Sequence, residues 1–95
     1  MRCVSFPDNT VLFYKGDKAD MFYIILSGEV NAILIDEAGN EKIINTLSVG
    51  RSFGERALIN KMPRSLTVKT TIASTFITVD RVDFKQILER DVNAQ

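Results

Sequence analysis

Short runs of β-forming residues, separated by clusters of turn-forming residues, fill roughly the first eighty positions of the chain. Runs of this length are too short for an ordinary helix, and their regular spacing is typical of an all-β sandwich or barrel. Because a chain of 95 residues is too short for two hydrophobic cores, we expect a single domain over residues 1–95. The predicted strands are 3–6, 11–14, 21–26, 30–35, 42–47, 66–69 and 75–79.

Some of these runs also indicate how they are buried. The run 21–26 is continuously apolar, which predicts a central strand that is covered on both faces. The runs 30–35 and 42–47 flank the polar loop 36–40, where Gly39 can adopt a positive φ, so they predict a hairpin with a solvated tip.

The last part of the chain changes from a strand pattern to a helical one. The run 66–69 alternates apolar with polar residues, which predicts a half-buried strand. Asp80 is a favourable N-cap, and Asp83 falls in the first turn, where the helix dipole favours a carboxylate. We expect an amphipathic helix whose apolar face carries Val82, Phe84, Ile87 and Leu88.

Charge and composition exclude several function classes. Twelve basic residues balance twelve acidic ones, so nothing in the net charge favours nucleic acid or an anionic membrane, and no apolar run approaches the ~20 residues of a membrane helix. The chain has no His, which removes the commonest general base and zinc ligand. Cys3 has no partner for an intrachain disulfide, so we expect a cytoplasmic protein. Cys3, Tyr14 and Tyr23 are interpreted as packing residues.

One segment, residues 53–68, interrupts the strand pattern and carries groups suited to a ligand. Gly54 followed by residues 55–58 suggests a single helical turn whose free amides could hold an anion. Arg64, directly after a proline, supplies a permanent fork-shaped cation for a phosphate. Glu55 would repel that phosphate unless it accepted a hydrogen bond from a donor such as a ribose hydroxyl. Together the two side chains predict a sugar phosphate.

The two halves of this segment resemble the phosphate-binding cassette of cyclic nucleotide-binding domains. Residues 53–58 read Phe-Gly-Glu-Arg-Ala-Leu, and residues 63–68 read Pro-Arg-Ser-Leu-Thr-Val. The resemblance covers nearly the whole chain, and it implies a mainly β fold, an eight-stranded β-roll with a short cassette helix and a C-terminal helix. It implies cGMP or cAMP as the ligand, and no metal or other cofactor. Further matching positions are Gly16-Asp17, 22–25, 27–30 and Gly50.

The resemblance also implies a role for each matching site residue. Glu55 would accept the ribose 2′-hydroxyl and Arg64 would bind the cyclic phosphate. The backbone amides of Ala57 and Leu58 would bind the remaining phosphate oxygens, and the Gly54 backbone would contact the ribose.

Two positions bear on the choice of base. Ser65 stands where cAMP-selective kinase subunits usually carry Ala and cGMP-dependent kinases usually carry Thr, so it slightly favours cGMP over cAMP. A basic residue such as Arg56 can stand at this position in cGMP-dependent kinases, but a solvated charge is the better explanation of it. Leu66 departs from the small residue common in the family. The family's leading helices and its long helix over the base have no counterpart here, so we expect an excised roll of a larger protein, in which Met1 need not be native.

Three functional readings follow. The main one is an allosteric regulatory module without enzymatic activity, coupled to the effector domain of a parent chain such as a cyclic nucleotide-dependent kinase. A second is a degenerate β-roll that serves protein interaction or oligomerisation without nucleotide. The third, a cupin-like metal enzyme, is disfavoured because the sequence offers no His and no cluster of ligands.

Overall fold

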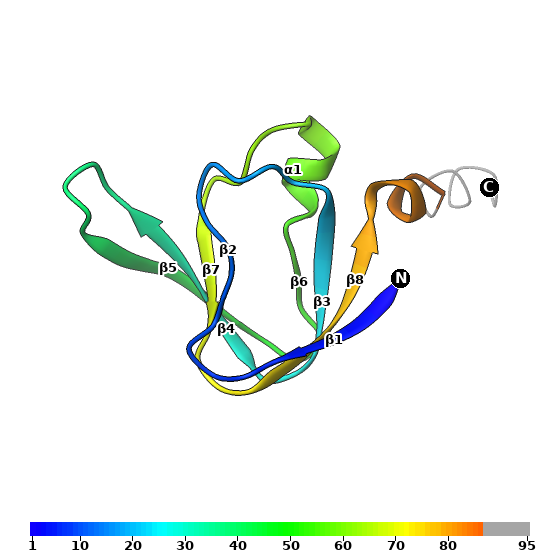
Figure 1. The fold of residues 1–95 in the computed structure, drawn as a ribbon, viewed down its shortest axis with the longest axis horizontal. Coiled ribbons are helices and arrows are strands. Elements are labelled where there is room, and N and C mark those ends of the chain that lie inside the picture. The colour runs from blue at the N-terminus through cyan, green and yellow to red at the C-terminus, as the bar shows by residue number, and fades with distance from the viewer. Residues whose placement is uncertain (87–95) are drawn as a thin grey trace.

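A computed structural model of the chain, which describes residues 1–86, shows two four-stranded antiparallel sheets packed against each other (Figure 1). The strand orders are β1-β8-β3-β6 and β2-β7-β4-β5. This confirms the mainly β fold. The elements are β1 (Arg2–Phe6), β2 (Val11–Phe13), β3 (Met21–Ser27), β4 (Glu29–Ile35), β5 (Glu41–Ser48), β6 (Ser52–Phe53), α1 (Glu55–Asn60), β7 (Thr67–Thr70) and β8 (Ser74–Asp80).

An aromatic cluster occupies the centre of the core between the sheets. The rings of Tyr23 and Phe53 stack with their centroids 5.1 Å apart, and Phe76, fully buried, meets both rings edge-on. Such offset and edge-on pairs add about 0.5–1.5 kcal/mol each beyond the burial of their area. Phe53 lies on β6, a two-residue strand that the sequence pattern did not predict, so this cluster positions the start of the cassette.

Strand β3 is covered on both faces, as its continuous apolar run predicted. Tyr23 and Ile25 face the core between the sheets, whereas Phe22 packs on the opposite face with Leu58 of α1 and Val79 of β8. The prediction was wrong at the end of the run. Leu26 is exposed, and the pairing of β3 with β8 shifts register at this point, between Ile25 and Ser27.

The predicted hairpin is present as β4 and β5, with an exposed turn at residues 36–40 and Gly39 at φ +86°. Asp36 organises the turn, since its Oδ1 accepts hydrogen bonds from the backbone N–H groups of Ala38 (2.9 Å) and Asn40 (2.8 Å). A β-bulge between Ala32 and Ile33, which the pattern did not indicate, shifts the register of this pair.

The expectation of a half-buried β7 was wrong. Thr67 and Thr70 are as buried as Val68, because the segments that precede β2 and β3 cover the second face of the strand. Each hydroxyl has a partner there. Thr67 Oγ1 accepts from the Lys15 N–H (3.0 Å), and Thr70 Oγ1 accepts from the Thr10 N–H (2.8 Å).

A C-terminal helix begins after Asp80, and residues 81–86 of it are described. The N-cap is confirmed, because Asp80 Oδ1 accepts a hydrogen bond from the Asp83 N–H at 2.8 Å. Phe84 packs edge-on against Phe22, but Val82 is 65% exposed and does not share its face. Val82 and Phe84 are two residues apart, which places them about 200° apart around a helix and explains the error. Ile87 and Leu88 lie outside the described residues.

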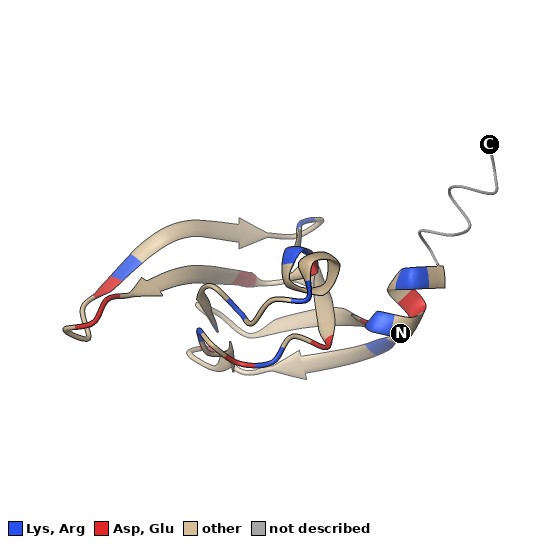
Figure 2. Ribbon diagram, turned by 90° about the horizontal axis from the view of Figure 1, so that it is seen from above, with Lys and Arg blue, Asp and Glu red and all other residues tan. Residues whose placement is uncertain are grey.

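Of the three predicted packing residues, only Tyr23 is buried. Cys3 is exposed because it lies on the outer face of the edge strand β1, and Tyr14 is exposed because β2 ends one residue before it. Lys and Arg are interspersed with Asp and Glu along the fold (Figure 2). Among residues 1–86, no helix has the length and hydropathy that crossing a membrane requires.

Candidate functional site

The cassette begins where β6 passes directly into the short helix α1. Gly54 makes this junction with a φ of +90° and a ψ of −3°, a left-handed conformation that side chains disfavour. No side chain caps the helix at Gly54. At the other end, Lys61 also has a positive φ, and its N–H donates to the Ala57 carbonyl. Leu58 anchors the helix, because its side chain is buried against Phe22 and Val79.

Arg64 is a buried cation, with only 5% of its surface exposed. Its Nη1 donates to the Gly54 carbonyl at 3.0 Å, and its Nη2 donates to the Met21 carbonyl. The guanidinium carbon lies 4.0 Å from the centre of the Phe13 ring. Burial lowers the pKa of the Arg64 guanidinium below its ordinary value. The guanidinium nevertheless stays protonated near neutral pH, as arginine does throughout proteins. The site therefore contains a full positive charge.

Gly54 provides space for this guanidinium. A Cβ atom at position 54 would lie only 2.5 Å from Arg64 Nη1. The sequence suggests that this glycine lets a ligand approach the backbone, and the structure adds a second reason for it, since a side chain at position 54 would collide with Arg64. The glycine and the arginine, ten positions apart, thus form one local unit.

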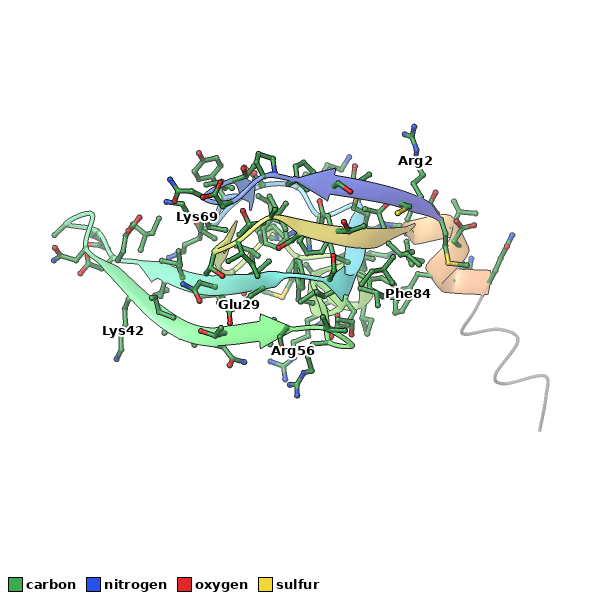
Figure 3. All side chains as sticks on the ribbon, turned by 90° about the horizontal axis from the view of Figure 1, so that it is seen from below. Arg2, Glu29, Lys42, Arg56, Lys69 and Phe84 are labelled. Atoms are coloured by element: carbon green, nitrogen blue, oxygen red, sulfur yellow. The ribbon has the colours of Figure 1, made fainter. Side chains whose placement is uncertain are left out.

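A hollow of about 480 Å³ opens between the cassette and the sheet that contains β4, β5 and β7. Five of the six predicted site residues line it, namely Gly54, Glu55, Ala57, Arg64 and Ser65. Leu58 is the exception, since its side chain points to the opposite face of β3. Arg56 also borders the hollow, but its side chain is exposed and extends away from the body of the fold (Figure 3).

Two buried polar atoms in this site have no hydrogen-bond partner among the described residues. They are Glu55 Oε2, an acceptor, and Arg64 Nε, a donor. The two side chains do not pair with each other, because the sole ion pair found within residues 1–86 joins the Met1 amino group to Asp83. A simple Glu–Arg surface pair, the plainest non-functional explanation of the motif, is therefore not what forms. Two residues that line the hollow therefore each have a polar atom, one carboxylate acceptor and one guanidinium donor, that no described protein group uses.

The sequence reasoning missed part of the wall of the hollow. Ile44 and Asn45 of β5 both line it, although neighbours on a regular strand face opposite sides. The β-bulge explains this, because Ala32 pairs with Asn45 and Ile33 pairs with Ile43, which leaves Ile44 as the extra residue. Asn45, directly after the apolar pair Ile43 and Ile44, was the one signal that could have drawn attention to this wall.

Comparison with known proteins identifies the family to which this fold belongs. Residues 3–91 match the family model described as "Cyclic nucleotide-binding domain". This chain therefore belongs to the cyclic nucleotide-binding domain family. It is 38% identical over 87 residues to Rap guanine nucleotide exchange factor 3 of Mus musculus, which covers 90% of this chain and 9% of that protein. It is 33% identical over 90 residues to a cGMP-dependent protein kinase of Plasmodium berghei, which covers 95% and 10%.

Solved structures show the same fold. The cAMP-bound form of the EAL enzyme Bd1971 is similar with a TM-score of 0.84 and 31% identity, over 94% of this chain and 23% of that one. The catabolite activator protein of Thermus thermophilus is similar with a TM-score of 0.89 and 25% identity, over 94% and 42%. The chain spans a tenth or less of the length of the exchange factor and the kinase.

Proposed function

We propose that this chain binds a 3′,5′-cyclic nucleotide in the hollow beside α1. Arg64 binds the cyclic phosphate, Glu55 accepts the ribose 2′-hydroxyl, and the Gly54 backbone contacts the ribose. The amides of Ala57 and Leu58 bind the remaining phosphate oxygens. The nucleotide is the only ligand required, and the site needs neither metal nor cofactor.

A single observation carries this proposal, the two unpartnered buried atoms of one hollow. A lone buried acceptor or donor costs roughly 1–3 kcal/mol, and more when it is charged. A ribose hydroxyl donates a hydrogen bond that Glu55 Oε2 lacks, and a phosphate oxygen accepts one that Arg64 Nε lacks. A cyclic nucleotide presents both groups on one rigid ring system, so one ligand satisfies both atoms.

For the base, we propose a slight preference for cGMP over cAMP. Ser65 lines the hollow and is exposed, so its hydroxyl is free to meet the amino group of guanine. Asn45, on β5, is another polar side chain that lines the hollow. Paired affinities of both nucleotides for the wild type and for Ser65→Ala measure the preference, and a larger loss for cGMP supports the serine contact.

We also propose that the domain is a regulatory module, without chemistry of its own, within a longer cytoplasmic signalling protein. Support comes from Leu58, a cassette residue on α1 whose side chain shares a cluster with Phe22, Val79 and Phe84 of the C-terminal helix. When the phosphate draws α1 inward, Leu58 must repack against that helix. A ligand that makes different contacts in two states shifts their balance, typically by about 1–3 kcal/mol, and an effector domain of the parent chain would respond.

Isothermal titration of the chain with cAMP and with cGMP tests the binding proposal. Replacing Arg64 by Gln should weaken both affinities by about 1.5–3 kcal/mol, because the phosphate loses its charged donor. Arg2→Gln, which removes an exposed cation on β1, is the matched control and should change neither affinity. No heat with either nucleotide at millimolar concentration, or equal affinities for wild type and Arg64→Gln, would contradict the proposal and favour a roll that acts in protein interaction alone.

A further inference from the structure

The most unusual feature of Arg64 is that the groups in contact with its guanidinium, an aromatic ring and two backbone carbonyls, carry no net charge. Its guanidinium lies over the ring of Phe13, with 4.0 Å between the carbon Cζ and the ring centre. Two backbone carbonyls, those of Gly54 and Met21, take one donor from each terminal nitrogen. Asp17 and Asp20 act on the charge only from a distance, because neither forms an ion pair with it.

This environment stabilises the cation without neutralising it. An aromatic face attracts a cation through its quadrupole, but it carries no net charge and accepts no conventional hydrogen bond. A carboxylate in the place of Phe13 would hold Arg64 more strongly, yet an incoming anion would then have to displace it. An aliphatic residue in the same place would fill the volume and supply no electrostatic attraction.

The position of the Phe13 ring is itself determined by its neighbours. A register shift between β2 and β7 pairs Val11 with Lys69 but Phe13 with Val68, so β2 has a bulge at this point. The ring also packs against Tyr23 (5.9 Å between centroids) and Phe53 (6.1 Å) of the aromatic core. Phe13 lines the same hollow as Arg64. The ring is therefore a fixed support for the cation.

We propose that Phe13 is a positioning residue for ligand binding, which keeps the Arg64 guanidinium buried and oriented in the free protein with its charge still available to an anion. This inference rests on the proposed role of Arg64 in binding the phosphate. Without the ring, the side chain spends most of its time in solvent, and each binding event must first bring it back. The apparent affinity then falls in proportion to the fraction that remains in place.

Three substitutions separate positioning from simple packing. Phe13→Leu keeps an apolar side chain but removes the ring face. Phe13→Tyr keeps the ring face and is the conservative rescue. Phe6→Leu is the matched control, because Phe6 is also half-buried and packs on the same core through Phe76, at 6.1 Å between centroids, without contact to Arg64. A fourth variant, with 3,4,5-trifluorophenylalanine at position 13, keeps the shape of the ring and weakens its quadrupole.

The first readout is the NMR signal of the Arg64 Nε–H group in the ligand-free protein. Stacking on the ring should shift it and protect it from exchange, and Phe13→Leu should abolish both effects, whereas Phe6→Leu and Phe13→Tyr should keep them. The second readout is the affinity for cAMP. We expect Phe13→Leu to weaken it roughly fivefold to thirtyfold, the value of a buried cation–π contact, and the trifluorinated ring to weaken it in the same direction.

The outcomes distinguish a failure of the positioning role of Phe13 from a failure of the proposed nucleotide binding. If Phe13→Leu leaves the Arg64 signal unchanged, or if Phe6→Leu weakens cAMP binding equally, the positioning role of Phe13 is wrong. If the fluorinated variant binds as tightly as the wild type, the quadrupole is not what holds the cation, and the proposal is wrong on that ground. If the Arg64 signal changes as expected but no variant and no wild type binds a cyclic nucleotide, the stacking is real. In that case the proposed function has failed, and with it the role of the ring in binding.

Discussion

Replacing Gly54 by Ala should destabilise the protein more than the same change at another glycine with the same backbone conformation. Gly54 has a φ of +90° and Gly39, at the hairpin tip, has a φ of +86°, so both variants incur a similar strain of roughly 1–2 kcal/mol. An added Cβ at Gly39 meets no atom within 4 Å, whereas at Gly54 it would lie 2.5 Å from Arg64 Nη1. Only the second variant must displace the guanidinium.

The size of the difference follows from the contact that is lost. When Arg64 moves, it loses its hydrogen bond to the Gly54 carbonyl, and a hydrogen bond to a charged group contributes about 1.5–3 kcal/mol. The free energy of unfolding, from urea titration at constant m-value, should therefore fall by about 1.5–3 kcal/mol more for Gly54→Ala than for Gly39→Ala. Nucleotide affinity should fall for Gly54→Ala alone. Equal stability losses, or unchanged binding by Gly54→Ala, would refute the view that this glycine exists to accommodate Arg64.

Two further predictions concern carboxylates. Calorimetry should show that the wild type binds 2′-deoxy-cAMP more weakly than cAMP by about 1.5–3 kcal/mol, and that Glu55→Gln shows a clearly smaller difference. The reason is that a carboxylate accepts a stronger hydrogen bond from the 2′-hydroxyl than an amide does. Equal differences for the two proteins would mean that Glu55 does not contact the ribose. In the hairpin turn, hydrogen bonds from the backbone N–H groups of Asn40 and Ala38 lower the pKa of Asp36 below its ordinary value. The ionised form is thus favoured by folding, so its stabilising effect is complete above the ordinary pKa and disappears as the pH falls through the lowered one. The protection factors for hydrogen exchange at Ala38 and Asn40, which correct for the intrinsic pH dependence of exchange, should fall over that acidic range. Protection that Asp36→Asn leaves unaltered would contradict this.

Much of the fold was predictable because its signals are local. The hairpin follows from two β-forming runs around a polar loop with Gly39. The helix start follows from Asp80, whose carboxylate accepts a hydrogen bond from an amide three residues later. The buried state of β3 follows from an uninterrupted apolar run. Errors arose where burial depends on what another segment covers. Thr67 and Thr70 are buried although they are polar, and Leu26 and Val82 are exposed although they are apolar.

For the site, the sequence alone identified the types of residue and their order. Glu55 and Arg64 together predicted a sugar phosphate before any fold was known, because the formal charge and the hydrogen-bonding groups of a side chain follow from its residue type. What only the tertiary structure decided is how those groups are held. The stacking of Arg64 on Phe13 and the bulge that turns both Ile44 and Asn45 toward the hollow join segments far apart in the chain. Such contacts depend on strand register and packing, which no local pattern of residues records.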